Sequence, residues 1–203
     1  MKIICIGRNY AEHAKEMNSA VPTNPIFFLK PDTALFKDKN PFYIPDISSE
    51  MHYECELVVR INKVGKNIKE KFAHKYYNEI GLGLDFTARD LQQRCKEKGL
   101  PWEIAKAFDN SALISNDFIT IEHKNINDLN FELKLNDNIV QQGNPSQMIF
   151  TIDQIIAYIS QFITLKKGDL IYTGTPSGVG PVSIGDQLKG SINGNVFFNL
   201  DIK

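Results

Sequence analysis

The sequence predicts an α+β protein dominated by β-structure, with a mixed β-sheet coiled into a roll or irregular barrel. Three observations indicate this fold class. Short apolar segments of strand length recur along the chain and are separated by polar turns. Helical patterns are few and short. Beyond residue 166 only strands and turns are expected. At 203 residues, we expect a single domain, residues 1–203, with a large core.

The first 45 residues contain two predicted strands and one short helix. Residues 1–7 form an apolar first strand, and Gly7 marks the turn into a helix over residues 9–17. The following segment is rich in proline and shows little periodicity, apart from a strand over residues 26–29.

Two buried strands and a helix are expected in the middle of the chain. The strands cover residues 57–61 and 80–84 and are separated by a polar segment. A helix over residues 87–98 has Asp90 in its first turn and ends at the Gly99-Leu100-Pro101 sequence.

The last part of the chain predicts a hairpin, one amphipathic helix and further strands. The hairpin pairs residues 131–135 with 138–142 through Asn136-Asp137. Thr151 caps a helix whose apolar stripe consists of Ile152, Ile155, Ile156, Ile159 and Phe162. The final strands are residues 170–173, 185–190 and 195–202, with the last two joined at Asn193-Gly194.

Composition and charge exclude several classes of function. Hydrophobic residues make up 42% and charged residues 23% of the chain, and the net charge is −1. There is no cluster of basic and aromatic residues, so we expect no nucleic-acid partner. No apolar segment is long enough to span a bilayer, and residues 1–7 are too short for a signal peptide. Three widely spaced cysteines without a Cys-x-x-Cys motif fit reduced thiols in a cytoplasmic protein.

Three carboxylates are expected to converge where two buried strands end. Glu54 and Glu56 share one strand face, because successive side chains of a strand point to opposite faces, and Asp85 closes the next strand. Two carboxylates about 4 Å apart repel by roughly 4 kcal/mol at an effective dielectric constant of 20. Such a cluster needs protons or a cation, and all-oxygen ligands suit Mg²⁺, Mn²⁺ or Ca²⁺. A solvated strand face is the alternative.

The segment from Gly7 to Met17 is dense in polar side chains. His13 and Glu16 are three residues apart, so they share a helix face and form a pair suited to a general base. A chance pair on a surface helix is the alternative. Arg8 is placed to bind a carboxylate, or is a surface charge.

Further candidates follow the carboxylates. Lys106 lies among apolar residues, where it either extends to solvent or supplies positive charge or a proton near a reacting enolate. Gln92 lies on the helix after Asp85. The glycine-rich segment around Thr175 lacks the Lys and Ser/Thr of a phosphate-binding loop, so it is either a plain turn or a site that grips a substrate carboxylate.

The joint order of these motifs resembles the fumarylacetoacetate hydrolase family, especially its short members of the acylpyruvate hydrolase and oxaloacetate decarboxylase type. The motifs are Gly7-Arg8-Asn9-Tyr10-x-x-His13-x-x-Glu16, His52-x-Glu54-x-Glu56, Leu84-Asp85-x-Thr87-Ala88-Arg89-Asp90-x-Gln92, Gly99-Leu100-Pro101-Trp102-x-x-x-Lys106 and Thr173-Gly174-Thr175-Pro176-x-Gly178-Val179-Gly180.

The resemblance implies the mixed β-roll of the family's C-terminal domain, a homodimer, and Mg²⁺ or Mn²⁺ bound by Glu54, Glu56 and Asp85. It also implies that His13 and Glu16 activate water on a mobile lid within residues 1–20, and that Lys106 is catalytic. The substrate contacts that we expect are Arg8, Tyr10, Gln92 and Thr175.

The substrate implied by the resemblance is a short 2-oxo acid. We expect hydrolysis of the C–C bond of an acylpyruvate, with decarboxylation of oxaloacetate as a further activity. Alternatives are a hydratase or isomerase acting on oxo-alkenoate or oxo-heptenedioate intermediates of aromatic breakdown, or an oxaloacetate tautomerase. The alternative that is not an enzyme is a metal-stabilised binding module without catalytic activity.

Overall fold

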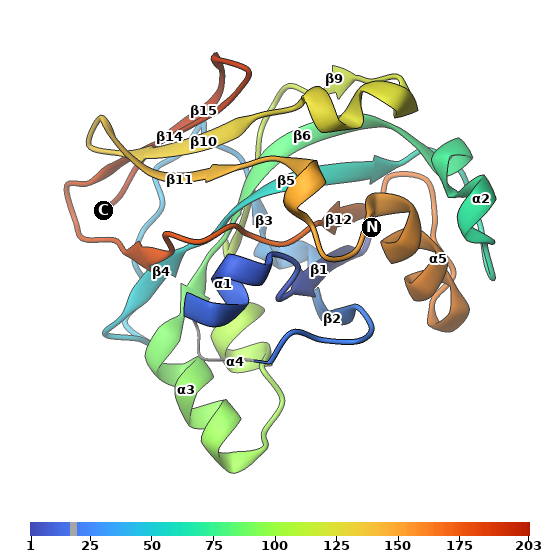
Figure 1. Ribbon diagram of the computed structural model, residues 1–203. Helices are drawn as coiled ribbons and strands as arrows, with labels where there is room; N and C mark the ends of the chain where they lie inside the picture. Colours follow the sequence, from blue (N-terminus) through green and yellow to red (C-terminus); the bar gives the residue numbers. More distant parts are fainter. Residues whose placement is uncertain (17–19) are drawn as a thin grey trace.

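A mixed, strongly twisted sheet forms the centre of the protein (Figure 1). The computed structural model describes residues 1–16 and 20–203. The strand order of this eight-stranded sheet is β2-β1-β12-β5-β6-β8-β3, and β9 pairs with β6. Its strands are β1 (Ile3–Gly7), β2 (Ile26–Lys30), β3 (Leu35–Phe36), β5 (Cys55–Ile61), β6 (Tyr77–Asp85), β8 (Ala112–Ile114), β9 (Ile119–Thr120) and β12 (Leu170–Tyr172).

Two smaller sheets complete the roll. The four-stranded sheet has the order β11-β10-β14-β15, and the three-stranded sheet has the order β13-β4-β7. The strands are β10 (Phe131–Leu135), β11 (Asn138–Gly143), β14 (Gln187–Ile192) and β15 (Asn195–Asp201), and then β4 (Met51–Tyr53), β7 (Thr87–Ala88) and β13 (Gly180–Pro181). Strands β10, β14 and β15 pack against β5 and β6, so the main core lies between the two larger sheets.

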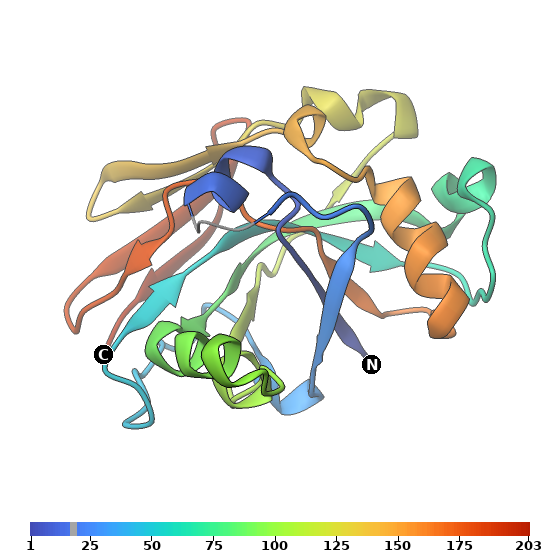
Figure 2. The same cartoon turned by 60° about the horizontal axis from the view of Figure 1, so that its bottom comes forward.

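Short helices lie around the sheets. Helices α2 and α5 pack together on one side of the molecule, whereas α3 and α4 pack together at another end (Figures 1 and 2). The helices are α1 (Ala11–Glu16), α2 (Glu70–Ala73), α3 (Arg89–Lys98), α4 (Glu103–Lys106) and α5 (Ile152–Phe162), with 3₁₀ turns at Asp32–Ala34, His74–Tyr76, His123–Asp128 and Pro145–Gln147. Within the described part of the chain, no helix is long and apolar enough to cross a bilayer.

The expected α+β roll is confirmed, and several element bounds differ from the prediction. Helix α1 begins at Ala11 instead of residue 9, and residues 17–19 of the expected lid lie outside the described residues. Helix α3 begins at Arg89, because Thr87 and Ala88 pair with β4 as a short strand. Thr151 caps α5 as predicted, with its side chain accepting a hydrogen bond from Gln154 N.

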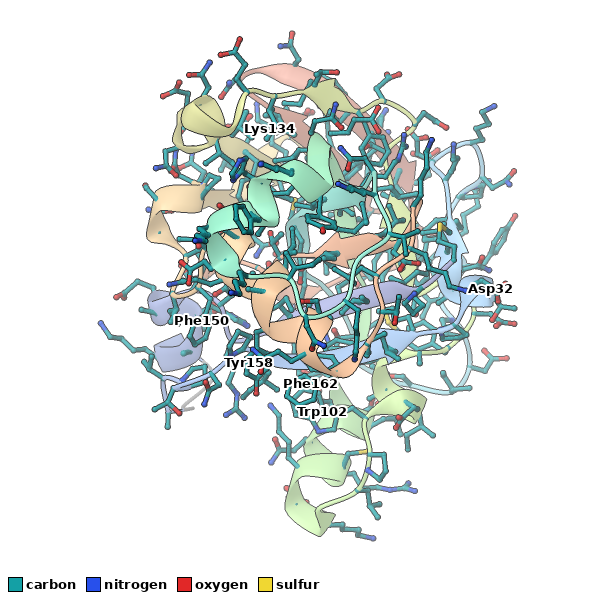
Figure 3. The ribbon with its side chains drawn as sticks, turned by 90° about the vertical axis from the view of Figure 1, so that its right-hand side faces the viewer. Asp32, Trp102, Lys134, Phe150, Tyr158 and Phe162 are labelled. Carbon is teal, nitrogen blue, oxygen red and sulfur yellow. The ribbon has the colours of Figure 1, made fainter. Side chains whose placement is uncertain are left out.

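Phe162, the last residue of the predicted apolar stripe of α5, is exposed. Its side chain is 58% exposed, whereas the four isoleucines of the stripe are buried. Phe162 is the last residue of the helix, and its ring packs edge-on against Tyr158 (Figure 3). The same ring lies 6.0 Å from the ring of Phe27 in β2.

Candidate active site

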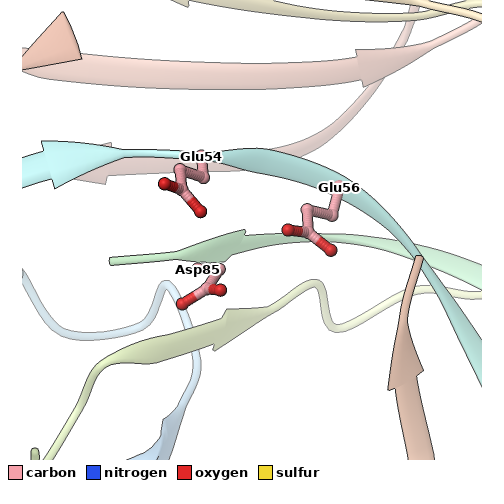
Figure 4. A group of neighbouring side chains, drawn as sticks. All are labelled: Glu54, Glu56 and Asp85. Carbon is pink, nitrogen blue, oxygen red and sulfur yellow. The ribbon is translucent and has the colours of Figure 1, made fainter. Parts of the chain in front are cut away.

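Glu54, Glu56 and Asp85 meet in the interior (Figure 4). One carboxylate oxygen from each residue lies within 4.8 Å of the others. The residues are 5%, 2% and 1% exposed, respectively. They are therefore a buried acidic cluster, which differs from the solvated strand face that was the alternative.

The strand pairing explains why these three side chains converge. Glu54 lies between β4 and β5, at the point where the chain leaves the three-stranded sheet and enters the large sheet. Strand β6 runs antiparallel to β5, and Asp85 N donates a hydrogen bond to Glu54 O at 2.8 Å. The end of β6 is thereby fixed beside the start of β5, so Asp85 faces the two glutamates.

Three cations surround the cluster. Lys106 Nζ lies 2.6 Å from Glu54 Oε2 and 2.9 Å from Asp85 Oδ2. Arg89 Nη2 donates to Glu54 Oε1 at 2.7 Å. Lys30 Nζ lies 2.7 Å from Asp85 Oδ1. These contacts neutralise Glu54 and Asp85, which together with the cations form one buried network.

Glu56 is held by a backbone amide and not by a cation. Gly174 N donates to Glu56 Oε2 at 2.6 Å. Gly174 has a φ of 100°, and a Cβ there would lie 2.6 Å from the Cβ of Asn9. Asn9 is fixed in turn, because its side-chain amide donates to Thr173 O at 2.7 Å. Only glycine fits at position 174, and it brings the amide into contact with Glu56.

The two glutamates differ in their electrostatics. Burial would raise the pKa of Glu54, but the Lys106 and Arg89 cations hold the pKa well below its usual value. Burial and the nearby Asp85 and Glu54 carboxylates raise the pKa of Glu56 well above its usual value. Glu56 is therefore the carboxylate that lacks a compensating positive charge.

Lys106 is a fixed positive charge. Burial alone would lower the pKa of Lys106, but the carboxylates of Asp85 and Glu54 raise it above its ordinary value. The ammonium group is fully enclosed and donates to both carboxylates. It is thus better suited to offset negative charge than to release a proton at neutral pH.

The donor set fits a hard divalent cation. It consists of carboxylate oxygens from Glu54, Glu56 and Asp85, the ligand type that Mg²⁺ and Mn²⁺ prefer. A cation among these oxygens would also supply the positive charge that Glu56 lacks.

The predicted histidine–glutamate pair is present beside the cluster. His13 Nδ1 lies 2.9 Å from Glu16 Oε2, and His13 is buried. Glu16 Oε1 accepts a hydrogen bond from Gly178 N at 3.0 Å, so one carboxylate joins α1 to the glycine-rich segment. Because Glu16 occupies Nδ1, Nε2 is the ring nitrogen available for a proton transfer.

A cavity of about 450 Å³, including its mouth, opens over the carboxylates. The residues that line it are Ile6, Gly7, Arg8, His13, Phe28, Glu54, Glu56, Asp85, Arg89, Gln92, Lys96, Trp102, Lys106 and Thr175.

Eight of the ten predicted site residues line this one cavity, and the exceptions are Glu16 and Tyr10. Glu16 contacts His13 from outside the cavity. Tyr10 is buried in the core, and its hydroxyl has no hydrogen-bond partner among the described residues. Its role as a substrate contact therefore stays a prediction.

The hydroxyl of Thr175 forms two hydrogen bonds within the protein. It donates to Cys55 O at 2.9 Å and accepts from Gln141 Nε2 at 2.8 Å. Thr175 therefore ties the glycine-rich segment to the start of β5, and it still borders the cavity. Its expected contact with substrate stays a prediction.

Sequence reasoning missed Lys30, Arg89 and Lys96. Arg89 and Lys96 lie three residues before and four residues after Gln92, which is the spacing of one helix face and could have identified both. Lys30 carried a weaker signal, a single lysine at the end of an apolar strand and before a proline.

A β-roll that buries three carboxylates below a cavity, with cations and a histidine–glutamate pair around them, defines an enzyme with an acidic active site. The chain belongs to the fumarylacetoacetate hydrolase family, because the family model described as Fumarylacetoacetate (FAA) hydrolase C-terminal matches residues 2–199. The resemblance stated from the motifs is thereby confirmed.

Similar proteins cover the whole chain. The mitochondrial oxaloacetate tautomerase of Mus musculus is 44% identical over 99% of this chain and 91% of its own length. The mitochondrial oxaloacetate decarboxylase of Dictyostelium discoideum is 44% identical over 95% of this chain and 89% of its own length. The structure of fumarylpyruvate hydrolase from Pseudomonas aeruginosa in complex with Mn²⁺ and pyruvate is 35% identical, with a TM-score of 0.93, and the match covers all of this chain and 89% of that one.

Proposed function

We propose that this protein is an oxaloacetate tautomerase that works with a divalent cation and interconverts the enol and keto forms of the substrate. The observation that carries the proposal is the buried cluster of Glu54, Glu56 and Asp85 below a small cavity lined by further cations. The similarity to a tautomerase over 99% of the chain supports the same substrate.

Glu54, Glu56 and Asp85 would hold Mg²⁺ or Mn²⁺. The bound cation would supply Lewis-acid stabilisation of the negative charge that develops on the 2-oxo oxygen. Lys106 and Arg89 add positive charge beside the same site, because both donate to Glu54. The cavity is lined by four cationic side chains and three carboxylates, and a bound divalent cation would increase the excess of positive charge that favours an anionic substrate.

The chain's own residues then move one proton. His13 Nε2 would take the proton of the enol hydroxyl, and the resulting imidazolium would deliver it to C3 as the double bond shifts from C2–C3 to C2–O. Nothing is oxidised, and no group is lost. Glu16 fixes the imidazole by its contact with Nδ1 and stabilises the imidazolium. Lys106 stays protonated and offsets the negative charge.

Cleavage of acylpyruvates is the second candidate. The specific observation in its favour is the His13–Glu16 pair, which is the arrangement that activates a water molecule for attack on a carbonyl. The similar structure of fumarylpyruvate hydrolase supports it. The water would add to the distal carbonyl carbon, the C–C bond would break, and pyruvate would leave as its enolate to take up a proton.

One set of assays separates these reactions. We would follow the ultraviolet absorbance of the oxaloacetate enol with Mg²⁺ present and with EDTA, and measure CO₂ and pyruvate in parallel. Tautomerisation predicts fast, EDTA-sensitive relaxation of the absorbance without stoichiometric pyruvate. Acetylpyruvate would be tested in the same way, with acetate and pyruvate as the products. Relaxation at the buffer rate, with full occupancy by Mg²⁺, would contradict the proposed function.

A further inference from the structure

One face of α3 lines the cavity. Arg89, Gln92 and Lys96 occupy positions i, i+3 and i+7 of the helix and therefore share that face. Arg89 donates both to Glu54 and, at 2.7 Å, to Gln92 Oε1. At a rise of about 1.5 Å per residue, Lys96 lies roughly 6 Å further along the axis than Gln92. Lys96 is thus the cation of this row that lies furthest along the helix from Arg89.

Trp102 and the end of the helix hold Lys96 in this place. The Lys96 ammonium lies 5.9 Å from the centre of the Trp102 ring, and both side chains line the cavity. Lys96 belongs to the last turn of α3, where the helix dipole favours a positive charge.

Lys96 and Arg8 differ from the cations that contact the acidic cluster. Lys30, Arg89 and Lys106 each contact a carboxylate of the cluster. The side chains of Lys96 and Arg8 form no ion pair or hydrogen bond with any residue that the structure describes, although both line the cavity. Burial and repulsion from the Arg89 and Arg8 guanidinium groups lower the pKa of Lys96. The part of the cavity beside Lys96 and Arg8 is therefore cationic, and no carboxylate of the described residues pairs with either side chain.

We propose that Lys96, together with Arg8, binds the distal carboxylate of a four-carbon dicarboxylic acid whose 2-oxo acid end lies over Glu54, Glu56 and Asp85. This inference rests on the proposed function and adds to it a residue that selects dicarboxylates over monocarboxylates. Lys96 is a specificity residue, because it lies away from the atoms between which the proton moves.

Malate and lactate are matched probes for this role. Both carry a 2-hydroxy acid that can chelate the cation, and neither has a ketone to enolise, but only malate has a distal carboxylate. With Mg²⁺-loaded protein, calorimetry would give the Kd of each ligand for the wild type, Lys96→Met and Lys96→Arg. Lys98→Met is the matched control, since Lys98 is exposed on the same helix and outside the cavity.

We expect the wild type to bind malate more tightly than lactate. Lys96→Met should weaken malate binding roughly tenfold, as for the loss of a charge-assisted contact, and leave lactate binding unchanged. Lys96→Arg and Lys98→Met should keep the preference for malate. Equal weakening of both ligands, unchanged malate binding, or no preference in the wild type would overturn the inference.

Turnover distinguishes failure of this inference from failure of the proposed function. For oxaloacetate, we expect Lys96→Met to raise KM roughly tenfold with kcat nearly unchanged, since only uniform binding is lost. A lower kcat with an unchanged KM would contradict a role in specificity. Absence of oxaloacetate turnover by the wild type would contradict the proposed function, while the malate and lactate comparison would still decide the role of Lys96.

Discussion

Lys30 and Asp85 form an ion pair in the interior of the protein. Lys30 Nζ lies 2.7 Å from Asp85 Oδ1, and the two side chains are 0% and 2% exposed. Lys30 Nζ also donates to Ser111 O at 2.8 Å. Because Lys106 contacts the other oxygen of Asp85, this carboxylate is fixed from both sides. Its orientation toward Glu54 and Glu56 is therefore set before any ligand arrives.

Lys30→Met is expected to destabilise the fold. The substitution keeps the apolar stem but leaves Asp85 Oδ1 buried without its partner, and breaking a buried pair costs about 3–5 kcal/mol. Urea denaturation would measure the change. Lys37→Met, at an exposed lysine, is the control and should be nearly neutral. If the double variant Lys30→Met/Asp85→Asn were no more stable than Lys30→Met, the loss would not come from the unpaired charge.

His13→Ala is expected to slow the candidate reactions of this site to different extents. Loss of a positioned general base should slow enol–keto interconversion and acylpyruvate cleavage about 10²–10⁴-fold. Decarboxylation of oxaloacetate needs no base at this position and should fall much less. Rates for all three reactions would be measured on one preparation. Equal losses in all of them would argue against this division of roles.

Glu56→Gln is expected to weaken metal binding and to abolish activity. The carboxylate must lose its proton to bind a cation, and the pKa of Glu56 is raised by burial and by Asp85 and Glu54. Metal affinity should therefore increase with pH, with release of a proton on binding. Calorimetry of Mn²⁺ binding in buffers of different ionisation enthalpy would count that proton. Full activity of Glu56→Gln in the presence of EDTA would show that the metal assignment is wrong.

The same carboxylate makes the stability of the metal-depleted protein depend on pH. The folded pKa of Glu56 is raised, so its contribution to stability is fully present below the unfolded value of about 4.5 and is lost as the pH rises through the folded value. We expect Tm in EDTA to fall as the pH is raised above this range. Glu56→Gln should flatten the fall, whereas Glu103→Gln, at an exposed site, should not. If the wild type, Glu56→Gln and Glu103→Gln had identical profiles of Tm against pH, Glu56 would not be the source of the pH dependence.

Gly174→Ala is expected to damage both stability and metal binding. A Cβ at this position collides with Asn9, and the φ of 100° is unfavourable for alanine. Gly168→Ala is the matched control, because Gly168 has a φ of 91° with open space around it. Both variants should lose about 1 kcal/mol or more from backbone strain, and Gly174→Ala should lose more. Equal Tm and equal Mn²⁺ affinity in the two variants would show that the contact with Asn9 is unimportant.

The acidic cluster was predictable because it depends on short-range geometry. Glu54 and Glu56 share a face through the two-residue period of a strand, and Asp85 follows the next apolar run. Gln92 was found because it lies on the helix that follows Asp85, and Lys106 because it is a lysine among apolar residues. The β-roll and most of its strands could likewise be read from alternating apolar and turn segments.

The missed residues depend on contacts between distant segments. Lys30 reaches Asp85 only because β2 and β6 belong to one sheet, and no local pattern specifies that sheet order. The placement of Tyr10, a predicted substrate contact, likewise depends on a feature that sequence spacing does not show. Arg8 has a φ of 59°, so the strand alternation of β1 does not continue past it, and Tyr10 enters the core instead of the cavity.

The carboxylate of Glu16 has two tasks, because one of its oxygens contacts His13 and the other accepts from Gly178 N. Any movement that detaches α1 from the glycine-rich segment also removes a constraint on the imidazole. The alignment of the imidazole therefore depends on a contact between two segments that lie more than 160 residues apart in the sequence, and it is not a property of α1 alone.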